Sequence, residues 1–272
     1  MQTKLTVIVD NIPQEPLHGE WGLSILAAHR GSSILIDAGA SGLFAENMRA
    51  LGLSIRDVDC AMLSHAHYDH ANGMVRFFQE NATAKFYLRE SAQENCYARY
   101  LIFRKYIGLS RHVLTDYKDR IVHVSRDYLL SDGAYLIGHK TPGLSQIGKR
   151  ERMYQKTPRG LVPDDFSHEQ SLVLETERGL LIVNCCSHGG VVNIIREVRE
   201  TFPGKHVYGY IGGFHLFNKS DAEIRAVAQN IRATGLEFVC TGHCTGQRAY
   251  DILKQTLGNR LHHLHVGLEM TF

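Results

Sequence analysis

The chain has 272 residues, 30 Lys and Arg against 28 Asp and Glu, a formal charge of +2 and 44% hydrophobic residues. This length and apolar content allow a substantial core and exclude a disordered chain. The balanced charge gives no basic stripe of the kind that binds nucleic acid, and no apolar run is long enough to span a membrane. Residues 1–10 lack the pattern of a signal peptide. We therefore expect a soluble, cytoplasmic protein, and the charge alone names no ligand.

The first half of the chain alternates short apolar runs with helical patterns. Apolar and β-branched runs predict strands at residues 5–10, 21–28, 33–36, 58–63 and 85–88. The apolar spacing of residues 43–51 predicts a helix that ends near Gly52, and a second helix is predicted through residue 78. An acid, Asp37, closes the third strand, which is unusual for a buried apolar run.

The second half repeats the alternation of strands and helices. Strands are predicted at residues 171–175, 180–183, 207–211, 238–240 and 261–266. Helices are predicted at residues 191–200, 222–233 and 247–257. Two successive series of this kind indicate an α/β fold with two sheets packed face to face and helices outside. No linker divides the chain, so we expect a single domain over residues 1–272.

Residues 91–165 differ from the rest of the chain in composition and periodicity. They are expected to form an insertion and loop region over the active site. Residues 91–128 are rich in Tyr and Arg without strict periodicity, which fits a helical hairpin packed on the sheet or a lid that faces the substrate. The later part is rich in Pro, Gly and basic residues and predicts a surface loop. Arg150 and Arg152 are candidate phosphate contacts there, although a solvated basic loop is the commoner explanation.

The sharpest signal is the run Ser64-His65-Ala66-His67-Tyr68-Asp69-His70, directly after the fourth predicted strand. Histidines two residues apart on an extended segment point to the same side, so both imidazoles can bind one cation. Asp69 and His70 fall at the start of the next helix, where a tight turn brings them back toward the same space. Four ligand-type side chains within six residues predict one metal site or two adjacent sites.

This histidine pattern, with the Asp37-Ala38-Gly39 strand end upstream, resembles the metallo-β-lactamase superfamily, whose fold is an αββα sandwich. Four further motifs resemble one subgroup, which contains archaeal dihydropterin ribofuranosylaminobenzene phosphate synthases and uncharacterised relatives. These motifs are Glu169-Gln170-Ser171-Leu172, Cys186-Ser187-His188-Gly189-Gly190, Gly212-Gly213-Phe214-His215-Leu216 and Thr241-Gly242-His243-Cys244-Thr245-Gly246. The resemblance covers nearly the whole chain and is specific for fold and metal rather than substrate.

The resemblance also implies a ligand set. Many members of the superfamily have a histidine after a Thr-Pro-Gly turn, but here Leu144 follows that turn. We therefore expect His188 to replace it and to bind the first metal with His65 and His67. His243, which follows a predicted strand and is flanked by glycines, is expected to complete a second site with Asp69 and His70; the alternative is a surface histidine at a helix end.

Several other residues are assigned with open alternatives. Cys186 lies near the strand end where many members have a bridging aspartate, so it is either a thiolate ligand or a buried apolar residue. Asp37 is expected to hydrogen-bond a ligand histidine, and Glu169 either does the same or only begins a strand. Asp69 and His215 are the catalytic candidates, with His215 expected to contact substrate or transfer a proton.

A site of this kind binds one or two divalent ions, most naturally Zn²⁺, with Mn²⁺ or Fe as alternatives. Neutral imidazole ligands leave the ion charge available to activate a water, which favours a metal-dependent hydrolase. The basic residues of the two loop segments suggest a small, anionic, phosphorylated substrate. Two alternatives remain: a synthase acting like the archaeal enzymes of the subgroup, and a metal-binding sensor without turnover.

Overall fold

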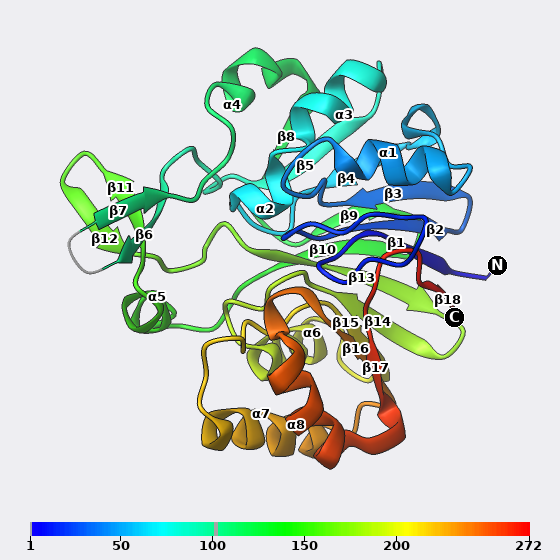
Figure 1. The fold of residues 1–272 in the computed structure, drawn as a ribbon, viewed down its shortest axis with the longest axis vertical. Coiled ribbons are helices and arrows are strands. Elements are labelled where there is room, and N and C mark those ends of the chain that lie inside the picture. Colours follow the sequence, from blue (N-terminus) through cyan, green and yellow to red (C-terminus); the bar gives the residue numbers. More distant parts are fainter. Residues whose placement is uncertain (1, 101–102) are drawn as a thin grey trace.

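The computed structural model describes residues 2–100 and 103–272, in which two seven-stranded sheets pack face to face between layers of helices (Figure 1). The N-terminal sheet has the order β18-β1-β2-β3-β4-β5-β8. Its strands are β1 Lys4–Val9, β2 Ser24–His29, β3 Ser32–Ile36, β4 Cys60–Met62, β5 Lys85–Arg89, β8 Ile121–Val124 and β18 Glu269–Thr271. Strands β3, β4, β5 and β8 run parallel to one another.

The second sheet has the order β17-β16-β15-β14-β13-β10-β9. Its strands are β9 Tyr128–Ser131, β10 Ala134–Gly138, β13 Gln170–Thr176, β14 Gly179–Val183, β15 Val207–Ile211, β16 Phe238–Thr241 and β17 Leu261–His263. The first four strands of this order are parallel to one another. Each sheet therefore has a parallel half, and the predicted αββα sandwich is confirmed.

Helices cover the outer face of each sheet (Figure 1). Those beside the N-terminal sheet are α1 Leu43–Ala50, α2 Tyr68–Ala71, α3 Met74–Glu80 and α4 Val113–Asp116, and those beside the second sheet are α6 Val191–Thr201, α7 Asp221–Ala233 and α8 Gln247–Leu257. In α6 the buried residues Val191, Ile194, Ile195 and Val198 recur at helical spacing, so one face packs on the sheet. Helix α7 begins with a capping box between Ser220 and Glu223.

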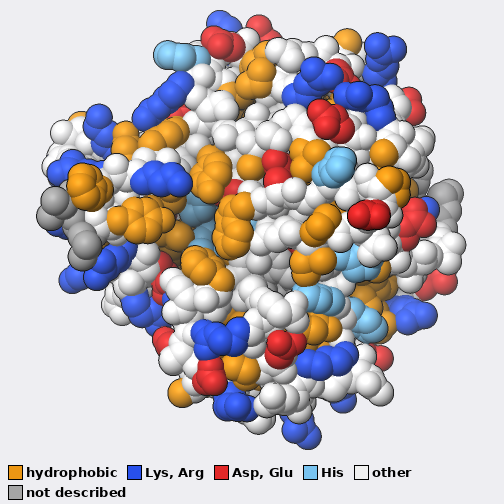
Figure 2. Space-filling view, in the orientation of Figure 1, with side chains coloured by type: hydrophobic (Ala, Val, Ile, Leu, Met, Phe, Trp, Pro, Cys, Tyr) orange, Lys and Arg blue, Asp and Glu red, His pale blue; other side chains and the backbone are white. Residues whose placement is uncertain are grey.

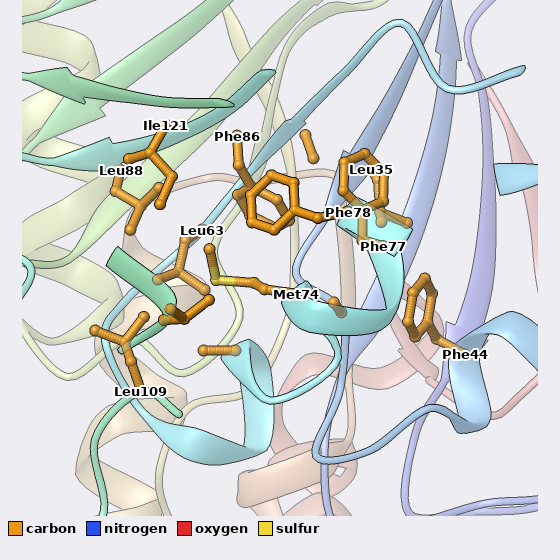
Figure 3. Close-up of a cluster of buried hydrophobic side chains, with 14 of the residues drawn as sticks. Leu35, Phe44, Leu63, Met74, Phe77, Phe78, Phe86, Leu88, Leu109 and Ile121 are labelled. Atoms are coloured by element: carbon orange, nitrogen blue, oxygen red, sulfur yellow. The ribbon is translucent and has the colours of Figure 1, made fainter. Parts of the chain in front are cut away.

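Three apolar clusters fill the spaces between the layers. One lies between α1–α3 and the N-terminal sheet, and Figure 3 shows Phe44, Met74, Phe77 and Phe86 from its helices and strands meeting there. The second lies between the two sheets and the third beneath α6, α7 and α8. The described residues include no helix long and apolar enough to span a membrane.

Two short helices, α2 and α3, form where one helix was predicted to continue through residue 78. Gly73 lies between them, and a Cβ there would lie 2.0 Å from the carbonyl oxygen of Ala38, so only glycine fits beside the end of β3. Helix α2 carries Asp69 and His70 at the edge of the sandwich.

Residues 91–165, expected to form an insertion and loop region, divide between two places. Strands β8, β9 and β10 belong to the two large sheets, and much of the rest forms a small separate sheet rather than a helical hairpin. Strands β6 Cys96–Tyr100, β7 Phe103–Tyr106, β11 Met153–Thr157 and β12 Gly160–Pro163 form a separate four-stranded sheet in the order β12-β11-β6-β7. Helix α5 Ser145–Glu151 and the single turn of α4 are its only α-helical neighbours among the described residues of the insertion. This small sheet projects beside one edge of the sandwich (Figure 1).

Candidate metal centre

Three histidines form a compact group at the edge of the sandwich. The ring centroids of His65 and His67 are 4.6 Å apart, and each lies 4.8 Å from the ring of His188. One donor nitrogen from each ring lies within 4.8 Å of the other two. Their Nε2 atoms are buried, and no described residue hydrogen-bonds to them. Three buried, unpaired nitrogens that face one another are costly unless they share a ligand, so the group fits a cation.

A second group lies beside the first and joins the two halves of the chain. The Nε2 atoms of His70 and His243 are 3.2 Å apart, and Oδ2 of Asp69 lies 3.7 Å and 3.5 Å from them, respectively. The Sγ atom of Cys186 is 3.3 Å from Nε2 of His70. Donor atoms bound to one tetrahedral Zn²⁺ are about 3.3 to 3.8 Å apart, given bonds of about 2.0 to 2.3 Å. These spacings therefore fit a second cation.

The parallel strands explain why both groups meet. Strand β4 ends just before the His65 to His70 run, while β14 and β16 end before Cys186 and His243. The carboxyl ends of parallel strands collect at one edge of an open sheet, where loops carry functional groups. Here the two sheets present such edges to each other.

Asp37 orients two of the ligands. One of its carboxylate oxygens accepts from the Ser64 amide at 2.6 Å, and the other accepts from Nδ1 of His70 at 2.7 Å and from the Ser64 hydroxyl at 2.6 Å. The Ser64 oxygen in turn accepts from Nδ1 of His65 at 2.9 Å. Because a carboxylate only accepts, both Nδ1 atoms carry the proton and both Nε2 lone pairs face the centre.

Glu169 holds the His188 loop through the main chain rather than through the imidazole. Its two oxygens accept the amides of His188 at 2.9 Å and of Gly189 at 2.8 Å. His139 lies between Glu169 and Glu197, with nitrogen-to-oxygen distances of 2.5 and 3.0 Å. Burial lowers the pKa of His139, but hydrogen bonds with the two carboxylates outweigh it and raise the pKa to about 9. His139 is therefore a buried cation at neutral pH.

The other ligand loops have supports of the same kind. Asp10 accepts the His243 amide at 3.0 Å, and the Asn11 side-chain oxygen accepts from Nδ1 of His243 at 3.1 Å. The Ala66 amide, between the first two ligand histidines, donates to Nδ1 of His168 at 3.1 Å. Nε2 of His168 then carries the proton and donates to Asp164 at 3.1 Å. Each ligand loop thus rests on a buried carboxylate.

The protonation states of the first group and of Asp69 suit cation binding. Burial and neighbouring histidines hold the pKa values of His65 and His188 well below their ordinary range and lower that of His67 to about 3. Burial raises the pKa of Asp69, but His70 and His243 outweigh it and hold the pKa below its usual value. Metal ligands must be deprotonated, so these side chains are ready at neutral pH.

Two cavities meet at His188 and His215. The metal-side cavity is also lined by Trp21, Tyr68, Tyr100, Lys105 and Phe217, together with several of the ligands. In Figure 2, histidine atoms are visible in a hollow between hydrophobic side chains, beside the part of the surface formed by the small sheet. The adjoining cavity is mainly apolar and has Arg150 and Lys219 among its lining residues.

His215 lies between the cavities and close to the first group. Its ring centroid is 4.5 Å from that of His188, and its Nδ1 is buried and without a hydrogen-bond partner among the described residues. Its backbone has φ of +50°, which is unusual outside glycine and turns the side chain toward the site. This placement is compatible with a contact to substrate.

The two arginines expected at the substrate differ in position. Arg150 lines the adjoining cavity, although its side chain is 64% exposed and its Nε lies 3.0 Å from Glu151. Arg152 ends α5 in a left-handed conformation and lines neither cavity. Arg150 is thus the better placed of the two for a contact with substrate, and the role of Arg152 stays a prediction.

The sequence reasoning missed several contributors to the site. They are Asp10, Asn11, His139, Asp164, His168, Cys244 and Lys105. Two of them had a local signal: His139 precedes the Thr-Pro-Gly turn by two residues, and Cys244 lies within the motif from Thr241 to Gly246. The remaining contacts depend on segments that are distant in the chain, and no motif marks them.

Comparison with known proteins places these features in a family. The model of the metallo-beta-lactamase superfamily matches residues 22–202. The chain is 25% identical to the 7,8-dihydropterin-6-methyl-4-(beta-D-ribofuranosyl)-aminobenzene-5'-phosphate synthase of Methanocaldococcus jannaschii, over 90% of both chains. It is also 25% identical to an uncharacterized protein of the same organism, over 97% of this chain and 98% of the other.

Among solved structures, Tm1679, described as a metal-dependent hydrolase of the beta-lactamase superfamily, is 28% identical with a TM-score of 0.83 and covers 98% of both chains. The family match contains the histidine run and the His188 loop, whereas His243 lies beyond it in the chain. With a family model that matches most of its length and a sandwich edge that gathers the family's type of ligands, the chain belongs to the metallo-β-lactamase superfamily.

Proposed function

We propose that this protein is a metal-dependent hydrolase that acts on a small anionic substrate at a centre with two divalent ions. The observation that carries the proposal is the triad of buried, unpartnered Nε2 atoms of His65, His67 and His188, with the group around His70 and His243 beside it. Buried polar atoms without partners are rare in folded proteins, and here three of them face one point. Zn²⁺ suits this nitrogen-rich set best.

The chemistry follows from the donor set and the open cavity. A divalent cation held by neutral imidazoles lowers the pKa of a coordinated water to about 7 and polarises a carbonyl or phosphoryl oxygen. Asp69, whose pKa is depressed, remains an acceptor and can orient the water. His215, with a free buried Nδ1 at the junction of the cavities, can give a proton to the leaving group.

The walls of the metal-side cavity support an anionic substrate with a flat apolar part. Lys105 lines this cavity and places its ammonium 5.5 Å from the ring centroid of Tyr68. Trp21 and Phe217, which also line this cavity, are 45% and 47% exposed and contact each other edge to face. A phosphate can pair with the ammonium while a ring packs on the exposed aromatic side chains.

A synthase acting on a phosphorylated pterin precursor is the second candidate. The observation that favours it is the 25% identity to the archaeal synthase over 90% of both chains. In that case the same ligands would hold the ion as a Lewis acid or phosphate anchor. The two candidates differ in whether water is the attacking group.

The experiment combines metal analysis with a substrate screen. Purified protein is expected to bind about two equivalents of Zn²⁺, and His67→Ala is expected to lose the first metal without unfolding. The zinc-loaded protein is then tested on phosphodiesters, phosphomonoesters, thioesters and lactones. Wild-type metal content in His67→Ala would contradict the site, and bound metal with no hydrolysis in the whole screen would favour the synthase or a sensor.

A further inference from the structure

A second thiol lies directly beside Cys186 in the metal centre. The Sγ atoms of Cys186 and Cys244 are 3.3 Å apart, and both side chains are buried. One donor atom each from Cys186, His243 and Cys244 lies within 4.8 Å of the other two. Both cysteines also line the metal-side cavity. The sulfur pair therefore lies at the second group of ligands.

The backbone is shaped to bring Cys244 to this position. His243 and Cys244 form the single turn η3 His243–Thr245, and His243 has a φ of +47°, which is costly for a residue other than glycine. A Cβ at Gly213 would lie 2.5 Å from Sγ of Cys244, so the glycine provides the space for the sulfur.

The surrounding main chain fixes the sulfur further. The carbonyl of Cys244 accepts the amides of Leu216 and Phe217 at 3.0 and 3.2 Å. The His215 amide points at the Cys244 sulfur at 3.3 Å, as an N–H donor would toward a thiolate. These contacts hold the sulfur toward the ligands rather than toward the apolar core.

We propose that Cys244 and Cys186 together form a dithiolate edge of the second metal site, beside His243. This inference rests on the proposed metal-dependent function and adds a ligand that the sequence analysis did not assign. Two thiolates and one carboxylate give the second site three negative charges and soft donors, whereas the first site offers three neutral nitrogens. The second site should therefore select Zn²⁺ and discriminate against Mn²⁺ and Mg²⁺.

The alternative role for Cys244 is a thiol that hydrogen-bonds to a ligated Cys186 without binding the ion. The two roles differ in the number of sulfurs bound to metal. Thiolate-to-Co²⁺ charge transfer absorbs in the near ultraviolet, with an intensity that rises with the number of thiolates, whereas d–d bands in the visible report the bound ion itself. Co²⁺ replaces Zn²⁺ in tetrahedral sites, so both signals are available in the full-length protein.

The test is Co²⁺ titration of the wild type, Cys186→Ser, Cys244→Ser and the double variant, in a reductant that contains no thiol. Each single variant is expected to lose about half of the charge-transfer intensity and the double variant all of it, while d–d bands from the first site persist. Cys60→Ser is the matched control, because this half-buried thiol lies on β4 outside the ligand groups and should leave the spectrum unchanged. Full charge-transfer intensity in Cys244→Ser would overturn the proposal.

Zinc X-ray absorption on the wild type gives a second measurement that needs no variant. With two Zn²⁺ bound, the dithiolate edge predicts an average of about one sulfur per zinc at about 2.3 Å, whereas ligation by Cys186 alone predicts about half of one. The lower value would overturn the inference and leave the proposed function intact. Absence of bound metal and of d–d bands would overturn both.

Discussion

The buried cation His139 provides the most demanding test of how the His188 loop is held. In His139→Gln an amide can still donate one hydrogen bond, but the positive charge between Glu169 and Glu197 is lost. All three side chains are nearly inaccessible, with 6%, 0% and 3% of each exposed, so solvent screens the interaction weakly. The substitution should therefore destabilise the fold by an amount that depends on pH.

The magnitude follows from the shift in pKa. A pKa of about 9 in the folded protein, against an ordinary value of 6.5, corresponds to about 3 kcal/mol of stability from the protonated form. Because the folded-state pKa is raised, this contribution is complete below about pH 6.5 and is lost as the pH rises through about 9. The difference in unfolding free energy between wild type and variant should shrink by about 3 kcal/mol over that window.

The assay is urea unfolding of both proteins at about pH 6 and about pH 10, with a chelator present so that metal binding does not contribute. His206→Gln is the matched control, because His206 pairs with Glu237 at 2.9 Å at the surface, with the two side chains 52% and 60% exposed. Exposed pairs contribute about 0 to 1 kcal/mol, so this control should change little. An equal effect of His139→Gln at both pH values would refute the account of a buried cation.

Three further predictions concern the ligands and the cavity. His188→Ala should abolish binding at the first site in a Zn²⁺ titration, whereas Leu144→Ala should bind as the wild type does. Unchanged Zn²⁺ binding in His188→Ala would contradict the assignment of His188 as a ligand. Asp37→Asn should weaken Zn²⁺ binding by about 10- to 100-fold in competition with a chelator, because an amide cannot accept all three hydrogen bonds. Lys105→Ala should raise KM for a phosphorylated substrate more than for a neutral ester. Arg152→Ala is the control and should leave both KM values unchanged. Equal effects of Lys105→Ala on both substrates would contradict a phosphate contact.

Local sequence was sufficient where a few consecutive residues fix the geometry. The run from His65 to His70 follows a short buried strand, so its spacing alone places four ligand-type side chains around one region. The alternation of apolar strands with amphipathic helices likewise predicted two sheets packed face to face with helices outside. In both cases the information lies within a few turns of the chain, where the period of a strand or helix decides which side chains share a face.

The insertion shows why other features required the tertiary structure. Its Tyr- and Arg-rich sequence has no clear period, and strand β6 is stabilised by pairing with β11, where Ala98 lies opposite Met153. Strand formation of this kind depends on the partner strand and on cross-strand contacts rather than on the local pattern.

The supports of the ligands depend on distant segments in the same way. Asp10 accepts the amide of His243, and His168 accepts the amide of Ala66. Both hydrogen bonds form only because the strand ends of the two sheets meet at one edge of the sandwich. The sequence by itself therefore determined the fold class and predicted which side chains gather at the centre. The tertiary structure decided which buried carboxylates and thiols complete the site, because a hydrogen bond or ligand contact requires atoms within about 3 Å that no spacing along the chain specifies.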